Sequence, residues 1–576
     1  MALLRRISTF ACLLLGAWAT FAAPESADWR ERLASALQRP DSIGPATPLG
    51  VAIDARLSAL SHEAGSRESL RELAVLYHAN EYTDRALLLY DWLISTSESD
   101  EDRGRLNYLA AHLVKEKGDS ALAARYLEAS VAAYDSYPLA LTLLGDAKFK
   151  SGGLDAAEGL YRRAAKHDPA LGLAKLGLAR VQERRGDGAG MARILERLLK
   201  DDPGNSAAMA MLSQWYARAG DPKRAYELSQ SIGYSSSPPE RDPWLQPTRD
   251  AIFDAQRLDF LFLDYFMVGA YEAALPYLER MEELDTENPR WSRYRALLSM
   301  RSGYNDRAVA HLREGLSKGG EADVFHPLLI KALAIAGKRK EAERVATESV
   351  ARHGANAEVC LEWARLLVED NRLTEAGEVL DRGLESDPYA IESLLLRARI
   401  AMQTEDFSEA DDRLAMARQL SPLDPEVLVR AALIFMEAGR FAEALPYLRQ
   451  AHGAAPFYDE AIELLADAFF ELGKGAYVEG DVDGALARFD ESLEMRGSRV
   501  EILSAVAQVA FESGRYVKAE KAIGALLAAV GPQPKMLMAH GDALYRNGKR
   551  SEARLQWEAA LRAIESDGRF AALKPP

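Results

Sequence analysis

The fold is decided by residues 357–458, which read AEVCLEWARLLVEDNRLTEAGEVLDRGLESDPYA, then IESLLLRARIAMQTEDFSEADDRLAMARQLSPLD, then PEVLVRAALIFMEAGRFAEALPYLRQAHGAAPFY. These are three consecutive units of 34 residues, and the same residue types return at the same places in each unit. Small residues fill positions 8, 20 and 27, and proline fills position 32: Ala364, Ala398, Ala432; Ala376, Ala410, Ala444; Gly383, Ala417, Ala451; Pro388, Pro422, Pro456. Small residues at helical spacing predict two amphipathic helices per unit that approach closely. The proline cannot continue a helix and predicts the turn into the next unit.

This period and its residue pattern resemble the tetratricopeptide repeat. The pattern is most specific over 138–205 and 357–458. The resemblance implies an all-α fold, a right-handed α-solenoid of about fourteen helix–turn–helix units. It also implies a chain without catalysis of its own, which binds a peptide or protein in its concave groove. Units are expected to start at residues 67, 104, 138, 172, 206, 255, 289, 323, 357, 391, 425, 466, 500 and 534.

The N-terminus predicts export. Arg5 and Arg6 precede an apolar run, Phe10–Phe21, that is too short for a transmembrane helix and is followed by the small residue Ala22. We therefore expect cleavage after Ala22 and a periplasmic or secreted chain with no transmembrane segment. The predicted organisation is a signal peptide at 1–22, an N-terminal helical cap at 23–66, repeats at 67–239, a Pro-rich joint at 240–254, repeats at 255–567 and a tail at 568–576.

Four local features interrupt or close the period. A lone helix over 49–64 is expected to cover the first repeat, because terminal repeats need such a cover. Residues 233–254 contain four prolines and three serines, which predicts a loop, and Trp244 within it is expected to pack onto a neighbouring helix. The aromatic helix 258–267 is expected to pack in the core beside this joint. One unit starts seven residues late, which predicts an extended first helix over 459–478.

Charge and cysteine content exclude several classes of protein. The formal net charge of the chain is −16, and removal of Arg5 and Arg6 with the signal lowers it to −18. Such an acidic chain is not expected to bind nucleic acid or anionic membranes in general. Cys360 is the only cysteine outside the signal, so an intrachain disulfide is impossible in the mature chain, and its place in the repeat predicts a buried structural thiol.

The sequence predicts neither an enzyme nor a cofactor protein. Repeats occupy nearly everything from 67 to 567, and the remaining segments are too short to form a catalytic domain. The nine histidines are scattered, without the spacing of a metal site, and no nucleotide-binding or haem motif occurs. We therefore expect no catalytic residues, no metal and no cofactor.

The candidate site follows from the resemblance, which places positions 2, 5, 9 and 12 of each unit on the concave side. Position 9 gives a basic row in consecutive units: Lys331, Arg365 and Arg399. Position 5 gives an apolar row: Leu361, Leu395 and Val429. Position 2 gives a row of glutamates: Glu358, Glu392, Glu426 and Glu460. The basic row either forms ion pairs with glutamates of adjacent units or contacts an acidic ligand. The carboxylate clamp of cytosolic relatives, which needs Lys and Asn at positions including 5, is not reproduced.

Two functions fit these features. The first is an exported scaffold that holds a peptide or protein partner, acidic if it contacts the basic row, within a bacterial envelope assembly. The second is a periplasmic repeat protein that handles an exopolysaccharide during secretion.

Overall fold

Paired α-helices make up the part of the chain that the computed structural model describes, namely residues 33–62, 67–232, 240–496 and 499–566. No β-strand occurs within these ranges. The predicted signal peptide lies outside them. The chain divides into two compact units, Met1–Tyr294 and Arg295–Pro576.

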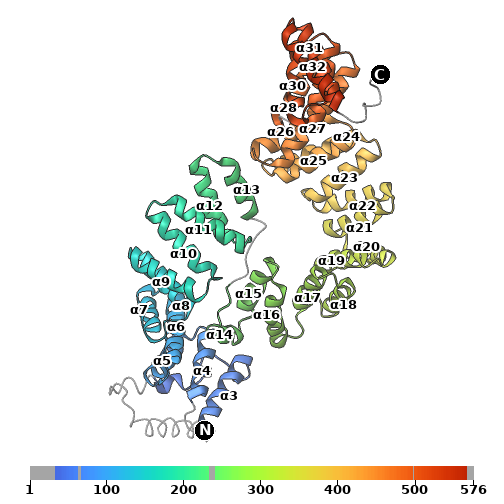
Figure 1. The fold of residues 1–576 in the computed structure, drawn as a ribbon. Helices are drawn as coiled ribbons and strands as arrows, with labels where there is room; N and C mark the ends of the chain where they lie inside the picture. The colour runs from blue at the N-terminus through green and yellow to red at the C-terminus, as the bar shows by residue number, and fades with distance from the viewer. Residues whose placement is uncertain (1–32, 63–66, 233–239, 497–498, 567–576) are drawn as a thin grey trace. The chain divides into compact units, whose positions relative to one another are not determined.

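The first unit begins with a single helix and continues with helix pairs (Figure 1). Its helices are α3 (Pro48–His62); α4 (Arg67–Ala79) and α5 (Thr83–Ser95); α6 (Asp100–Glu116) and α7 (Ser120–Ala133); α8 (Pro138–Lys150) and α9 (Leu154–His167); α10 (Gly172–Arg184) and α11 (Gly188–Asp201); α12 (Ser206–Ala219) and α13 (Pro222–Ile232); the short α14 (Gln246–Asp250); and α15 (Ala255–Met267) with α16 (Tyr271–Leu284).

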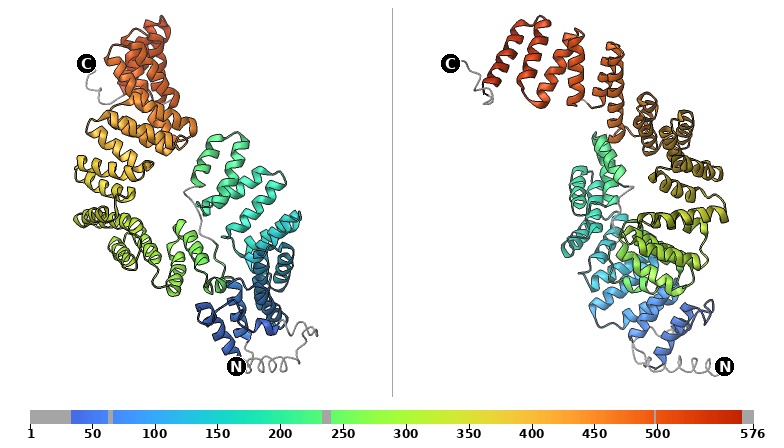
Figure 2. Two further views of the ribbon diagram at one scale, coloured as in Figure 1. Left: turned by 180° about the vertical axis from the view of Figure 1, so that it is seen from behind. Right: turned by 90° about the vertical axis from the view of Figure 1, so that its right-hand side faces the viewer.

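The unit boundary falls inside α17 (Pro289–Arg301), and the second unit contains the remaining pairs. These helices are α18 (Asn305–Ser317); α19 (Ala322–Ile335) and α20 (Arg339–His353); α21 (Ala357–Glu369) and α22 (Leu373–Ser386); α23 (Ile391–Gln403) and α24 (Phe407–Leu420); α25 (Pro425–Glu437) and α26 (Phe441–Ala454); α27 (Asp459–Val478) and α28 (Val482–Met495); α29 (Val500–Glu512) and α30 (Tyr516–Val530); α31 (Pro534–Arg546) and α32 (Arg550–Ser566). The right-hand view of Figure 2 shows the last pairs, in red, as parallel layers.

The helix pairs confirm the expected repeats. Thirteen of the fourteen first helices begin at the expected residue or within four residues of it, and the fourteenth is the extended helix predicted over 459–478. The lone helix expected over 49–64 is α3, whose described end is His62. The chain is therefore an all-α solenoid of helix–turn–helix units.

Every pair turns at a residue with positive φ, at position 15 of its repeat. Glycine occupies eleven of these positions, and Glu81, Asn371 and Glu405 the other three: Gly118, Gly152, Gly186, Gly220, Gly269, Gly303, Gly337, Gly439, Gly480, Gly514 and Gly548. A left-handed residue ends the first helix and allows the chain to reverse, and glycine adopts this conformation without a steric penalty.

The small residues of the repeat lie where helices approach most closely. The alanines at positions 8 and 20 of the three most regular units have no exposed surface: Ala364, Ala398, Ala432, Ala376, Ala410 and Ala444. Cys360 is also buried, with 1% of its surface exposed, which agrees with a structural thiol. Burial raises the pKa of the Cys360 thiol and keeps it protonated.

The first five pairs form a stack that ends at α13. Only Ala225 of this helix is buried, and its exposed residues include Lys223, Arg224 and Glu227. A polar outer helix is what the end of a repeat stack requires. The next pair, α15–α16, therefore does not continue from α13. Helix α15 instead contacts α4, at the opposite end of the stack. Arg257 of α15 donates a hydrogen bond to the carbonyl of Ala79, the last residue of α4.

The aromatic helix α15 is only partly core. Phe262 and Tyr265 are buried as expected, with 0% and 6% of their surface exposed. Phe260 is 70% exposed, so the expectation was wrong for this residue. Its position on the helix turns it away from the face that packs against α16 and Tyr294.

Candidate functional site

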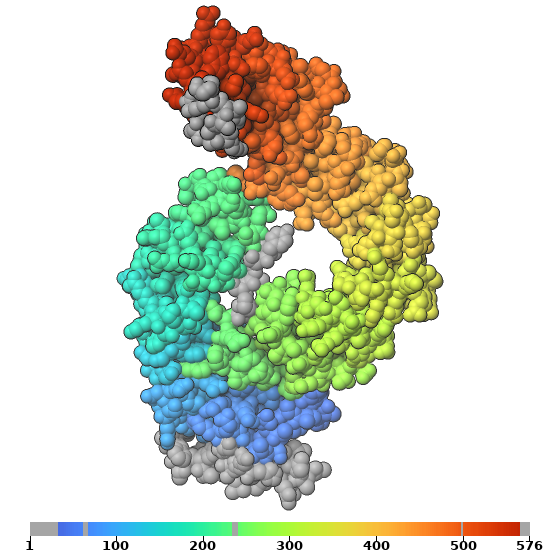
Figure 3. Space-filling model, turned by 45° about the vertical axis from the view of Figure 1, so that its right-hand side comes forward, coloured from blue at the N-terminus to red at the C-terminus, as the bar shows by residue number. Residues whose placement is uncertain are grey.

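Residues 240–257, which we name the return segment, lie across the inner surface of the first stack. The inner surface is the side formed by the first helix of each pair, and here it comprises α4, α6, α8 and α10. The segment runs antiparallel to the order of the repeats, from α10 past α8 and α6 to α4. Figure 1 shows its short helix α14 beside α4, and in Figure 3 the green residues of this region lie on the cyan helices of the same unit.

Asp242 and Trp244 of the return segment are both buried, with 6% and 7% of their surface exposed. The two carboxylate oxygens of Asp242 each accept a hydrogen bond of 2.6 Å, one from the Tyr108 hydroxyl and one from the Tyr137 hydroxyl. The Trp244 ring stacks on the Tyr137 ring at a centroid distance of 3.7 Å and an interplanar angle of 13°. It also meets Tyr108 edge-on at 5.6 Å. The prediction that Trp244 packs onto a neighbouring helix is confirmed.

The backbone of the return segment is also recognised. The side-chain amide of Asn80 donates to the Ala251 carbonyl and accepts from the Phe253 amide, both at 2.9 Å. This pair of hydrogen bonds satisfies both polar groups of an extended chain, as a neighbouring β-strand would. At the other end, the Glu240 carboxylate accepts a hydrogen bond of 3.0 Å from the Gly172 amide, at the N-terminus of α10.

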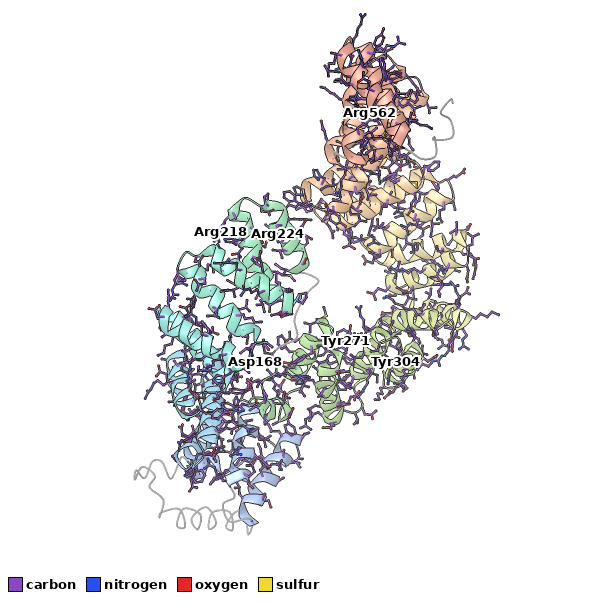
Figure 4. The ribbon with its side chains drawn as sticks, viewed as in Figure 1. Asp168, Arg218, Arg224, Tyr271, Tyr304 and Arg562 are labelled. Carbon is purple, nitrogen blue, oxygen red and sulfur yellow. The ribbon has the colours of Figure 1, made fainter. Side chains whose placement is uncertain are left out.

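The two tyrosines and the histidine under the return segment are uncharged at neutral pH. Burial, reinforced by the negative charge of Asp242, raises the pKa of the Tyr108 and Tyr137 hydroxyls, so both remain donors. Burial lowers the pKa of His112 to about 4. Burial also raises the pKa of Glu240, and the charge of Asp168, labelled in Figure 4 in the turn between α9 and α10, acts in the same direction.

In the second unit, the predicted basic row lies on the first helices α19, α21 and α23, and two of its members form ion pairs. The Arg365 guanidinium contacts Glu362 at 2.6 Å and Glu392 at 3.5 Å. Arg399 contacts Glu437 at 3.4 Å. Lys331 is exposed and forms no ion pair with any residue that the structure describes.

Glu392 connects three consecutive repeats. It accepts two hydrogen bonds from Arg430 of α25, at 2.6 and 2.8 Å, in addition to its contact with Arg365 of α21. The Arg430 hydrogen bond is the largest contribution that lowers the pKa of Glu392 and keeps it charged. Arg365 at position 9 thus pairs with position 2 of the next unit, and Arg399 pairs with position 13 of the next unit. Both are sideways pairings with glutamates of adjacent units, which was one of the two alternatives.

The apolar row at position 5 does not lie open to a ligand. Leu395 and Val429 are buried, with 3% and 1% of their surface exposed, and both belong to one core cluster with Ala398. Leu361 is half-buried against the core cluster that contains Cys360 and Ala364. Neighbouring first helices pack so closely that a side chain at position 5 lies between them, so Leu395 and Val429 cannot cover a ligand in this conformation.

Sequence reasoning missed Arg430 and the pair of tyrosines that hold Asp242. Arg430 occupies position 6, outside the positions assigned to the concave side, although an arginine at that place would complement the glutamates at position 2. Tyr108 and Tyr137 carry no local signal, because their partner lies more than a hundred residues away in the chain.

Within the described ranges, no group of three or more His, Cys, Asp or Glu side chains is arranged to hold a metal ion. Searched over the same ranges, none of the helices combines the length and the apolar character that a membrane span requires.

Comparison with known proteins identifies the repeat. A family model described as tetratricopeptide repeat matches residues 108–171, 142–190, 395–459 and 470–534. No curated protein matches the sequence.

Several solved structures are similar to the chain at low sequence identity. Yeast Tom70 is 14% identical, with 82% of this chain and 99% of that chain covered and a TM-score of 0.31. The C-terminal part of a TPR repeat-containing protein from Cytophaga hutchinsonii is 14% identical, with 44% and 98% covered and a TM-score of 0.36. YrrB, described as a TPR protein with an unusual peptide-binding site, is 17% identical, with 32% and 95% covered and a TM-score of 0.25.

Proposed function

Because the chain is a tetratricopeptide-repeat protein, we propose that it is a non-catalytic, exported scaffold that holds an extended segment of a protein partner on the inner surface of its repeats. The repeats make it an interaction scaffold in general terms. The partner, the export and the place in an envelope assembly are the proposal.

One observation carries this proposal. The inner surface of the first stack already holds another part of the chain, the return segment, through side-chain and backbone hydrogen bonds. These repeats therefore have the chemistry to recognise a polypeptide, and Asn80 pairs with one donor and one acceptor of a peptide backbone.

In the second unit the partner would contact the basic row. A carboxylate of the ligand would bind Lys331 directly and would compete with Glu362 or Glu392 for Arg365 and with Glu437 for Arg399. The long contacts at 3.5 and 3.4 Å are the ones that such a ligand would replace. Arginine suits this exchange because its planar guanidinium can bind a carboxylate through two hydrogen bonds.

The test is a double charge reversal, Arg365→Glu with Arg399→Glu, in the full chain used as bait for an envelope extract. We expect capture of the partner to fall more than tenfold, and wild-type capture to weaken as salt is added. The pairs with Glu392 and Glu437 are about half-exposed and are worth about 0.2–1 kcal/mol each, so their loss should change the melting temperature little. Glu362, whose side chain is 15% exposed, adds a further small loss.

The matched control is Arg344→Glu with Arg352→Glu on the second helix α20. These arginines also form exposed ion pairs, at 3.5 and 3.7 Å, and the net charge changes by the same amount. Capture that survives reversal of Arg365 and Arg399, or that both double variants weaken equally, would remove the basic row from the binding site. Digestion of the extract with protease before capture separates a protein partner from the exopolysaccharide alternative, because only a polysaccharide would still be captured.

Export is tested on the expressed full-length chain. We expect the intact mass of the periplasmic or secreted form to lack residues 1–22 or 1–23. Retention of Met1–Ala22, or a lipid on Cys12, would contradict the predicted signal peptide.

A further inference from the structure

The return segment is held to the first stack in the way that a bound peptide is held. Its recognised groups are one carboxylate, one aromatic ring, two polar groups of the backbone and apolar side chains such as Ile252, which has 1% of its surface exposed. Asp242 and Trp244 are separated by a single residue, Pro243, which fixes the backbone between them. Both anchors reach the same tyrosine, since Tyr137 donates a hydrogen bond to Asp242 and stacks on Trp244.

The surface beneath the segment suits a groove that is at times empty. It offers hydroxyl, imidazole and amide groups, from Tyr108, Tyr137, His112 and Asn80. These polar groups lie beside apolar ones, since Trp244 belongs to a core cluster of α6 and α8, and Leu245 and Phe253 pack against the core cluster of α4 and α6. The polar groups can form hydrogen bonds with water when a ligand leaves. The stack also has core clusters of its own: the cluster around Leu195 and Leu212 includes no residue of the return segment.

The fit of the return segment is also incomplete. The Nε2 atom of His112 is buried without a hydrogen-bond partner among the described residues, although His112 lies against Tyr108 with a ring-centroid distance of 4.7 Å. An unsatisfied buried polar atom costs free energy that another ligand could recover with one additional donor or acceptor. The inner surface therefore has a hydrogen-bonding atom, Nε2 of His112, that the return segment does not use.

We propose that the inner surface of α6 and α8 is a binding site for peptides that carry an aspartate two residues before a tryptophan, and that the return segment is a resident intramolecular ligand which such a peptide displaces. Asp242 of the resident is replaced by the aspartate of the incoming peptide between Tyr108 and Tyr137. Trp244 is replaced by its tryptophan on the Tyr137 ring. This site is distinct from the basic row, and different variants test the two.

The probe is a fluorescent synthetic peptide with the sequence of residues 240–254, ERDPWLQPTRDAIFD, measured by anisotropy against the full chain. The resident segment competes at high effective concentration, so the wild-type chain should bind the probe weakly. Asp242→Asn and Trp244→Ala each weaken the resident and should raise probe affinity at least tenfold. Asp264→Asn, which changes an exposed acid of the same unit, should leave probe affinity at the wild-type level.

Specificity is tested on both sides of the contact. A probe whose aspartate and tryptophan are replaced by asparagine and alanine should not bind any variant. Tyr108→Phe with Tyr137→Phe, added to Asp242→Asn, removes both hydroxyl donors and should reverse most of the gain. Circular dichroism establishes that each variant is folded, and Asp242→Asn keeps the shape of the side chain if Trp244→Ala does not fold.

Hydrogen exchange on the wild-type chain needs no variant. The amide of Phe253, which donates to Asn80, should exchange faster when the probe is saturating, because the return segment has left the surface. Folded Asp242→Asn protein that binds the probe no better than wild type, or a Phe253 amide whose exchange the probe leaves unchanged, would show that the return segment is a fixed part of the fold and would overturn the proposal.

Discussion

Replacement of Gly177 by alanine should destabilise the first stack, although alanine is ordinarily the better helix former. A Cβ atom at Gly177 would lie 2.4 Å from Cε1 of Tyr161 and 2.6 Å from its Cδ1 and Cζ atoms. Carbon atoms in good contact are about 3.5–4 Å apart, so the ring would have to move by about 1 Å. Tyr161 has no exposed surface, and its hydroxyl donates to Asp146 at 2.7 Å. Gly145 of α8 also packs closely on this ring, since a Cβ atom there would lie 2.7 Å from Cε1 of Tyr161.

The expected change in the free energy of unfolding for Gly177→Ala is the sum of two opposing effects. Overpacking of a close-packed site costs about 1–3 kcal/mol. Alanine loses less backbone entropy than glycine when the helix forms, which stabilises the folded chain by about 0.5–1 kcal/mol. Because the contact is severe and Gly145 also packs closely on the ring, we expect a net loss of about 1–2 kcal/mol in the free energy of unfolding of this region.

Gly159 is the matched control, because it lies inside α9 and a Cβ atom there would meet nothing within 4 Å. Gly159→Ala should therefore stabilise the stack by about 0.5–1 kcal/mol. Denaturant unfolding with hydrogen exchange over residues 154–184 measures both variants. Tyr161→Leu should rescue Gly177→Ala, with a coupling free energy of about 1 kcal/mol or more. If Gly177→Ala is as stable as Gly159→Ala, the ring does not constrain the helix approach and the reasoning fails.

Two further predictions concern local coupling and pH. Ala398→Leu adds volume at a site with no exposed surface and should lower the free energy of unfolding by about 1–3 kcal/mol. Faster hydrogen exchange should be confined to α23 and the adjoining helix pairs. A uniform increase in exchange rate from residue 67 to 566 would contradict local coupling. The second follows from burial, which lowers the pKa of His78 from 6.5 to about 3 and that of His112 to about 4, so the unfolded chain binds protons first on acidification. Stability should fall as pH decreases from 6.5 towards these values, by about 2 kcal/mol per histidine at pH 5. His78→Gln should lessen the pH dependence measured by denaturant unfolding, and an unchanged slope would mean that His78 is not buried in its neutral form.

Local sequence pattern determines most of the fold. The small residues at positions 8 and 20 and the turn residue at position 15 act within one helix pair, so the period alone locates the pairs. The extended helix α27 was predictable for the same reason, because insertion of two helical turns keeps its buried face in register.

The candidate site was less predictable, because its contacts join different repeats. Position alone places Arg365 and Arg399 on the first helices, but only the structure shows that Glu392 and Glu437 reach them. Leu395 and Val429 are buried by the next helix pair, an effect that depends on how closely neighbouring repeats pack. The docking of the return segment had no periodic signal, and proline and serine content predicted only that regular structure stops there.

Contacts that join residues so distant in sequence matter while the chain is being made. Tyr137 precedes Asp242 by 105 residues, so at about 5–20 residues per second a ribosome completes the receiving surface roughly 5–20 s before its ligand exists. Ring closure over such a length also carries an entropic penalty of about 4 kcal/mol, which the two hydroxyl contacts and the stacked rings must offset. A nascent chain therefore displays Tyr108 and Tyr137 uncovered for several seconds, and any chaperone present during that interval meets a vacant aromatic groove that the finished molecule conceals.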